Sequence, residues 1–158
     1  MLCQYLVMYC PYCGSSQIMV TNSRPTFSNS QVWRRRKCLS CKGLFTTHEA
    51  IDLSHLVVVK KSGKREKYSR VKLYAGIYNS TGSLKSRIEI QKLVQVITRK
   101  VEKEILLSKK RKISSEEIGE IVLMKLKTIS PGAFLSFLVN HKNINNEKQM
   151  KKHLLKYL

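Results

Sequence analysis

Two short cysteine pairs, Cys10-Pro-Tyr-Cys13 and Cys38-Leu-Ser-Cys41, decide the fold of the first third of this chain. In a C-x2-C pair both sulfurs can turn toward one ion, and two pairs supply four thiolates at about 2.3 Å from a tetrahedral zinc. A segment of this size buries too little apolar surface to fold unaided. The pattern therefore predicts one structural Zn²⁺ per chain, held by Cys10, Cys13, Cys38 and Cys41. Two disulfides or a redox C-x-x-C are the alternative interpretations.

The residues next to the cysteines fit two tight turns. Gly14 follows the first pair and Lys42-Gly43 follows the second, at positions where such turns need a positive φ. The spacing between the pairs is slightly longer than usual, so we expect a long hairpin loop from Pro25 to Gln31. Residues 1–7, which hold the fifth cysteine, are expected to be an N-terminal extension.

The charge of the chain predicts a polyanionic partner. Among 158 residues there are 30 Lys and Arg against 10 Asp and Glu, a formal net charge of +20. Four thiolates around one zinc would lower this to about +18. DNA, RNA or an acidic membrane surface would be attracted, although a general drift toward Lys is an alternative cause. No run of about 18 apolar residues is present, so we expect no transmembrane helix. We expect a soluble cytoplasmic protein without a membrane partner, in a reducing compartment where cysteines at this spacing bind metal.

A basic run leads directly into the second cysteine pair. If Arg34-Arg-Arg-Lys37 is a strand, Arg34 and Arg36 share one face, and Arg35 and Lys37 share the other. Arginine can clamp phosphates or reach guanine edges. The candidate DNA-binding residues are Arg24, Arg34, Arg35, Arg36, Lys37 and Lys42. The alternative is a solvated charged strand.

The second part of the chain begins with a hairpin pattern. His55–Lys61 is rich in β-branched residues, Ser62-Gly63 indicates a turn, and Lys64–Tyr68 follows as the second strand. A helix is expected to start near Ser69, with inward-facing residues Val71, Leu73, Tyr74 and Ile77.

Further helices are predicted from caps and apolar periodicity. Ser86–Glu89 has the form of a capping box and starts a helix to about Leu107. Others start at Ser114 and at Ser130-Pro131. The apolar stripes of these helices, and of a last amphipathic segment, are interpreted as core. They comprise Ile90, Leu93, Val94, Ile97, Val101, Ile105, Ile118, Ile121, Val122, Ile129, Ala133, Phe134, Phe137, Leu138, Met150, Leu154 and Leu158.

The predicted fold class is therefore α+β. A small N-terminal β zinc ribbon over residues 8–50 is followed by a mostly α-helical domain with a short β-hairpin over residues 53–145, and by an amphipathic tail over residues 146–158.

Several stretches occur here in a specific combination: Cys10-Pro-Tyr-Cys-Gly14, Ser23-Arg-Pro25, Arg34-Arg-Arg-Lys-Cys-Leu-Ser-Cys41 and Phe45-Thr-Thr-His-Glu49. Together they closely resemble the zinc ribbon of the NrdR family, bacterial transcriptional repressors of ribonucleotide reductase genes. Leu56–Glu66 with Lys72-Leu73 resembles the start of the family's second module, the ATP-cone, and Ser115–Glu120 resembles its third helix. The resemblance covers about residues 8–145.

The resemblance implies a nucleotide-responsive repressor and not an enzyme. In this family the cone binds ATP or dATP, expected here with Mg²⁺, and the bound nucleotide sets how subunits form homo-oligomers. The assembled form presents its ribbons to paired operator boxes in double-stranded DNA. The implied location is the bacterial cytoplasm or nucleoid.

The resemblance also assigns a nucleotide site. The matching residues are Val58, Lys60, Lys61, Glu66, Lys72 and Ser115. Ammonium groups suit phosphates, a carboxylate accepts hydrogen bonds from an adenine amino group or ribose hydroxyls, and a hydroxyl at a helix N-terminus lies where anions are favoured.

The chain departs from the family pattern at several positions: Asn22, Ser62 and Ser69 stand where Asp is usual, His48 and His141 where Tyr is usual, and Ser136 where Arg is usual. The alternative function is therefore a basic zinc-ribbon protein that binds nucleic acid without operator specificity, with a vestigial cone. An ATPase is poorly supported, because the chain lacks a G-x-x-x-x-G-K-[ST] loop and its only Asp is Asp52.

Overall fold

The computed structural model describes residues 8–26, 31–81 and 86–157. The chain divides into two compact units, Met1–Asp52 and Leu53–Leu158, and each is described by itself. Within the described residues, no helix is both long and apolar enough to cross a membrane. The predicted N-terminal extension and the predicted inward-facing Leu158 lie outside the described residues.

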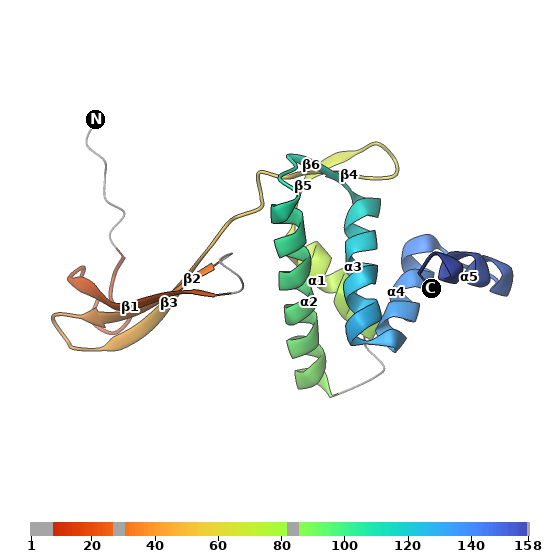
Figure 1. Cartoon of the computed structure of the whole chain (residues 1–158). Coiled ribbons are helices and arrows are strands. Elements are labelled where there is room, and N and C mark those ends of the chain that lie inside the picture. Colours follow the sequence, from red (N-terminus) through yellow and green to blue (C-terminus); the bar gives the residue numbers. More distant parts are fainter. Residues whose placement is uncertain (1–7, 27–30, 82–85, 158) are drawn as a thin grey trace. The chain divides into compact units, whose positions relative to one another are not determined.

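The first unit is a three-stranded antiparallel sheet (Figure 1). Strands β1 (Ile18–Thr26), β2 (Gln31–Cys38) and β3 (Leu44–Ala50) lie in the order β1-β2-β3. The ends of the predicted loop are strand, because Pro25 pairs with Val32 and Thr26 with Gln31. The middle of that loop, residues 27–30, lies outside the described residues.

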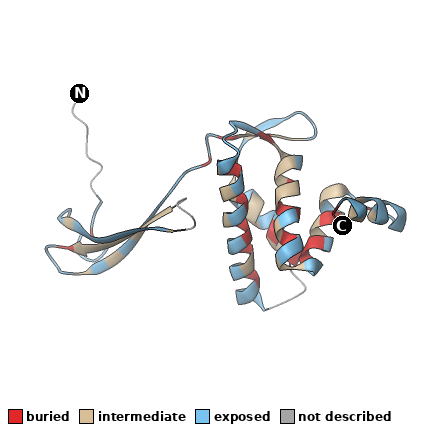
Figure 2. Ribbon diagram, viewed as in Figure 1, coloured by how far each residue is buried: buried red, intermediate tan, exposed pale blue. Residues whose placement is uncertain are grey.

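This sheet has almost no core of its own. Of its described residues, only Cys10 and Cys38 are buried, at 3% and 0% exposure. Figure 2 shows the strands mostly half-buried or exposed. Because apolar burial is the main source of folding free energy, the unit depends on another source of stability, and a metal held by four sulfurs provides one.

The second unit starts with a small mixed sheet. Strands β4 (Val57–Val59) and β5 (Arg65–Lys67) form the predicted hairpin, which is shorter than expected, with Gly63 at φ +81° in the turn. The sequence analysis missed β6 (Lys112–Ser114), which pairs with β4 in parallel. Three residues are too few for a periodic pattern, and parallel pairing joins distant parts of the chain.

Helices make up the rest of this unit (Figure 1). They are α1 (Arg70–Thr81), α2 (Arg87–Leu107), α3 (Ser115–Ile129), α4 (Pro131–Lys142) and α5 (Glu147–Leu154), followed by the 3₁₀ turn η1 (Leu155–Tyr157). The predicted capping box is confirmed, since Ser86 accepts from the Glu89 amide while the Glu89 carboxylate accepts from the Ser86 amide. Ser114 caps α3, and Pro131 opens α4.

The helices and the inner face of the sheet share one apolar core. Ile97, Val122, Leu126 and Leu138 are fully buried in it. The prediction that Val71 faces inward is wrong, because its side chain is 76% exposed. Val71 lies two residues before the core-facing Leu73, about 200° around the helix axis, so the two cannot share a face.

Candidate zinc centre and nucleotide pocket

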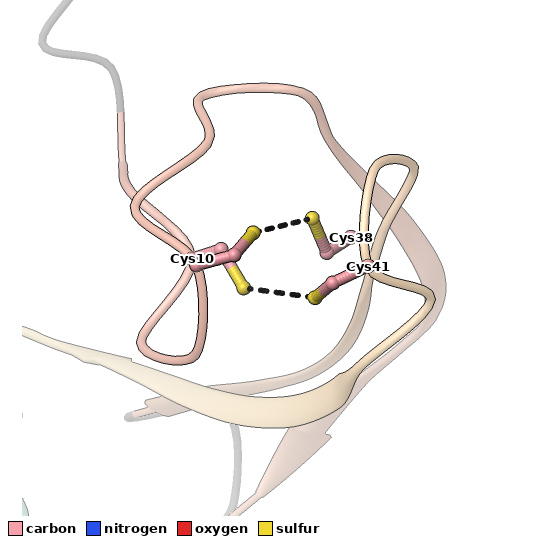
Figure 3. Close-up of side chains that lie close together, drawn as sticks. Cys10, Cys38 and Cys41 are labelled. Atoms are coloured by element: carbon pink, nitrogen blue, oxygen red, sulfur yellow. Dashed lines mark hydrogen bonds between the residues drawn. The ribbon is translucent and has the colours of Figure 1, made fainter.

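The four predicted zinc ligands converge on one point in the first unit. The Sγ atoms of Cys10, Cys13, Cys38 and Cys41 all lie within 4.8 Å of one another. Cys10 Sγ is 3.7 Å from Cys41 Sγ, and Cys13 Sγ is 3.7 Å from Cys38 Sγ (Figure 3). A tetrahedral zinc with bonds of about 2.3 Å sets its sulfurs roughly 3.8 Å apart. A disulfide would need about 2.05 Å, so the cluster fits zinc and not two disulfides.

The backbone of each turn forces the sulfurs together. Gly14 donates to the Cys10 carbonyl at 2.9 Å and adopts φ +71°. In the second turn the positive φ falls on Lys42, at +62°. Gly43 is required for a different reason, because a Cβ there would lie 2.5 Å from the Tyr12 ring.

The electrostatics of the cluster differ between its cysteines. The backbone amide of Cys41, followed by that of Ser40, lowers the pKa of Cys38 to about 6, although burial acts in the opposite direction. Although the Gly43 amide acts to lower it, the pKa of Cys41 is raised to about 12 by its hydrogen bond with Cys13 and by burial. A thiol must lose its proton to bind zinc. Four thiolates leave no open coordination position, so a zinc here holds the fold and does no chemistry.

The basic strand β2 is the central strand of the ribbon, and its residues alternate between two faces. Arg34 and Arg36 both reach Glu49, at 3.1 and 3.7 Å, and Arg36 Nε also donates to Thr47 at 2.8 Å. Arg35 donates to Thr46 at 3.1 Å. The predicted alternation of faces is therefore confirmed, and the single carboxylate of Glu49 offsets one of the two arginine charges on its face.

The opposite face of the ribbon has cations without a carboxylate partner in the described structure. Arg24 pairs with Trp33 across β1 and β2, and its guanidinium lies 4.4 Å from the indole centroid. Arg35 and Lys37 alternate with Trp33 along β2. Lys42 is held in its turn by a 2.7 Å bond from Nζ to the Leu39 carbonyl.

The second unit contains a cavity of about 150 Å³ between the sheet and helices α1, α3 and α4. A cavity of this size accommodates a group as large as an aromatic ring. Of the six residues predicted for a nucleotide, five line it, namely Val58, Lys60, Glu66, Lys72 and Ser115. The sixth, Lys61, does not line the cavity, and its Nζ donates to the carbonyl of His141 at 3.5 Å.

Glu66 bridges two of the pocket lysines. Its carboxylate oxygens lie 3.0 Å from Lys60 Nζ and 2.8 Å from Lys72 Nζ. Hydrogen bonds from Lys72 and then from Lys60 hold the pKa of Glu66 below its usual range. One carboxylate thus positions two ammonium groups and leaves one net positive charge, which suits an anionic ligand.

Comparison with known proteins finds a matching family for each of the two units. Residues 8–49 match the family described as "Transcriptional repressor NrdR-like, N-terminal domain", and residues 56–147 match the ATP cone domain. Proteins named "Transcriptional repressor NrdR" are similar over nearly the whole length. The one from Thermoanaerobacter sp. (strain X514) is 39% identical, covering 94% of each chain, and that from Finegoldia magna is 34% identical, covering 94% of this chain and 97% of its own.

This chain belongs to the NrdR family. It is a transcriptional repressor with a zinc ribbon and a nucleotide-responsive ATP-cone, and it is not an enzyme. The four-cysteine cluster, which can hold a metal ion, lies within the matched zinc-ribbon domain.

Several residues that line the NrdR cone pocket were not predicted as site residues, among them Gly119 and His141. His141 stacks on Phe137 with centroids 5.6 Å apart, and a Cβ on Gly119 would lie 2.1 Å from the imidazole. Burial, helped by Lys142 and Lys61, lowers the pKa of His141. Its buried Nε2 has no hydrogen-bond partner among the described residues. Two signals were present in the sequence. Gly119 lies inside an otherwise regular helix pattern, and His141 stands where the NrdR family usually has Tyr.

Proposed function

We propose that this protein binds operator DNA upstream of ribonucleotide reductase genes, and that ATP or dATP in the cone pocket sets its oligomeric state and its DNA affinity. Mg²⁺ accompanies the nucleotide, and the protein works in the bacterial cytoplasm or nucleoid. The observation that carries the proposal is the Lys60–Glu66–Lys72 cluster beside an aromatic-sized cavity, in a chain whose other unit presents arginines on a four-sulfur ribbon.

The pocket residues have distinct roles in this proposal. Lys60, Lys61 and Lys72 bind phosphates, and Ser115 at the start of α3 lies where the helix favours anions. Glu66 keeps the lysines extended in the free protein and accepts a hydrogen bond from the sugar or the base. Val58, 5% exposed, gives the base an apolar contact.

The ribbon residues contact the DNA. Arg35 and Lys37 are free of carboxylates on one face, with Arg24 beside them, and Arg34 and Arg36 reach DNA by leaving Glu49. Lys42, in the turn of the second cysteine pair, adds a contact to a DNA phosphate. Zinc supplies the rigidity that base readout requires.

Regulation follows from linkage. A nucleotide shifts assembly only if it binds one oligomer more tightly than another. If assembly changes DNA affinity, DNA must change nucleotide affinity by the same factor. A symmetric homo-oligomer can then bind repeated operator boxes with several ribbons at once, which raises its affinity for the DNA.

Operator specificity is tested by fluorescence anisotropy with a labelled duplex from upstream of the host's own ribonucleotide reductase genes. A scrambled duplex of equal length is the control. The proposal predicts at least about tenfold tighter binding to the native duplex, or about 1.4 kcal/mol. Equal binding of the two duplexes would establish the alternative, a basic zinc-ribbon protein without operator specificity.

A further inference from the structure

The net charge of this protein is concentrated outside the ribbon. Residues 53–158 contain 24 of the 30 Lys and Arg and 8 of the 10 Asp and Glu, so they carry +16 of the formal +20. The proposed nucleotide site uses only three of these cations, Lys60, Lys61 and Lys72. The remaining charge destabilises the folded unit by self-repulsion, unless a polyanion neutralises it.

The sheet β5-β4-β6 separates its residues onto two faces. Val58 pairs with Ile113 on one side and Glu66 on the other, and this inner face packs on the core and lines the pocket. On the outer face, Val57 pairs with both Lys67 and Lys112. Paired residues on neighbouring strands point to the same side. Lys67 and Lys112 therefore flank Val57, roughly 10 Å apart across three strands.

Arg65 extends the same outer face by one row, because it pairs with Val59. Arg65, Lys67 and Lys112 are all exposed, and none makes an ion pair within the described structure. The only carboxylate on these three fully described strands is Glu66, and it lies on the inner face, bound to Lys60 and Lys72. The outer face thus has three cations and no counter-charge.

The α2–β6 turn continues the cationic surface at one edge of the sheet. Its exposed residues Lys109, Lys110 and Arg111 precede Lys112 directly. Lys110 is neutralised by an ion pair with Glu117. Figure 1 shows the sheet at one end of α2 and α3, so this exposed turn lies at that end of the two helices.

The chemistry of this face fits the backbone of a duplex. It has no aromatic side chain on which unpaired bases would stack. It also has no large apolar side chain that would anchor it in a membrane, since its apolar residues are the half-buried Val57 and Val59.

We propose that the outer face of β5-β4-β6, with Arg65, Lys67 and Lys112, is a second contact for double-stranded DNA and binds phosphates. This inference rests on the proposed DNA-binding function and extends it from the ribbon to the cone. Phosphate contacts position a protein and carry no sequence information. The face therefore adds affinity without adding operator specificity.

The test compares two triple variants that lose the same charge. The first is R65Q/K67Q/K112Q on the outer face. The control is K92Q/K148Q/K152Q, three exposed lysines on α2 and α5. Dissociation constants are measured by anisotropy at four salt concentrations, with native and scrambled duplexes, in the nucleotide state that gives wild-type protein its highest affinity.

Each phosphate contact contributes about 0.9 to the slope of log K against log[salt]. The outer-face variant should therefore lose about 2 to 3 units of slope and bind at least about tenfold more weakly, with an unchanged native-to-scrambled ratio. The control should keep the wild-type slope. The single variants K67Q and K112Q, each losing about one unit, give the same test if the triple variant folds poorly.

A slope in the outer-face variant equal to that of the control overturns the proposal. So does a loss of oligomer mass in light scattering without a change of slope, which would assign the face to contacts between copies. The same experiment distinguishes failure of the operator hypothesis from failure of this proposal. If operator specificity is absent, the native and scrambled duplexes bind equally, but the salt slope of the outer-face variant still differs from that of the control.

Discussion

At the scale of single residues, the chemistry was predictable where its signal was a local spacing. The four cysteines and the alternation of Arg34 and Arg35 follow from C-x2-C turns and strand periodicity. His141 was not predicted as a site residue, because it approaches Gly119 from another helix and stands in an apolar stripe that also describes an ordinary core. Its place in the pocket is a property of helix packing, which no short pattern encodes.

Lys72→Gln tests the charge on the nucleotide pocket. Lys72 is the more exposed partner of Glu66, so its removal should leave the fold intact while removing a charge-assisted bond to phosphate. Such bonds contribute about 1.5–3 kcal/mol, so ATP affinity in calorimetry should fall about tenfold or more. Lys148→Gln on α5 is the matched control, and equal affinities of the two variants would contradict the assignment.

Gly119→Ala tests the contact with His141. The added Cβ would lie 2.1 Å from the imidazole, so the ring must leave its position, and nucleotide binding should weaken about tenfold. In the background of His141→Ala the same substitution should cost much less, because the clashing ring is gone. Additive effects in this double-mutant cycle would show that the two residues do not act together.

At the scale of elements, locally encoded structures were predicted and long-range pairings were not. The capping box at Ser86, the cap at Ser114 and the hairpin turn at Gly63 all use residues within a few positions. Strand β6 depends on β4, which is more than fifty positions away in the chain, and three residues have no pattern of their own. The inward orientation predicted for Val71 is wrong because its angle on α1 places this apolar side chain on the exposed side of the helix.

The ribbon should lose its fold with its metal. Cys38→Ser removes the most buried ligand from a unit whose described residues have almost no other core. We expect zinc content below one ion per chain, a changed Trp33 fluorescence and a loss of DNA binding, while the helical circular dichroism persists. Cys3→Ser is the control and should retain one zinc. Full zinc content and normal DNA affinity in Cys38→Ser would refute the four-thiolate site.

Glu120 joins the C-terminal turn to the cone. It binds Lys142 at 2.7 Å and Lys156 at 3.3 Å, and it accepts a hydrogen bond from the Tyr157 hydroxyl. Burial alone would raise its pKa, but the bonds from Lys142 and Tyr157 lower the pKa of Glu120 to about 2 from the usual 4.5. Its stabilising contribution is therefore present above about pH 4.5 and is lost as pH falls toward 2.

The measurement is thermal unfolding of the helical signal between pH 2 and pH 6. Wild-type protein should lose up to about 3 kcal/mol of stability from this carboxylate across that range. Glu120→Gln should be less stable at pH 6 and should show a flatter pH dependence. A variant with the wild-type pH profile would mean that this network contributes nothing to the fold.

At the scale of the whole molecule, the sequence indicates two functional units, and the account joins them through assembly. The pocket and the ribbon lie in separate compact units, so a nucleotide can influence DNA only through a shared equilibrium. We expect the mass from light scattering to differ between nucleotide-free, ATP-bound and dATP-bound protein. The K72Q variant should need a higher nucleotide concentration to reach the same change in mass. A mass that does not change with nucleotide in the wild-type protein would show that assembly is not part of the mechanism.

The most direct test of the central claim is the dissociation constant for the native duplex, measured without nucleotide, with ATP and with dATP. If nucleotide binding is coupled to DNA binding, at least two of the three values should differ by about tenfold or more, a coupling free energy of about 1.4 kcal/mol. K72Q should need more nucleotide to reach the same values. Three equal dissociation constants at saturating nucleotide would contradict the account and leave the cone without a regulatory role.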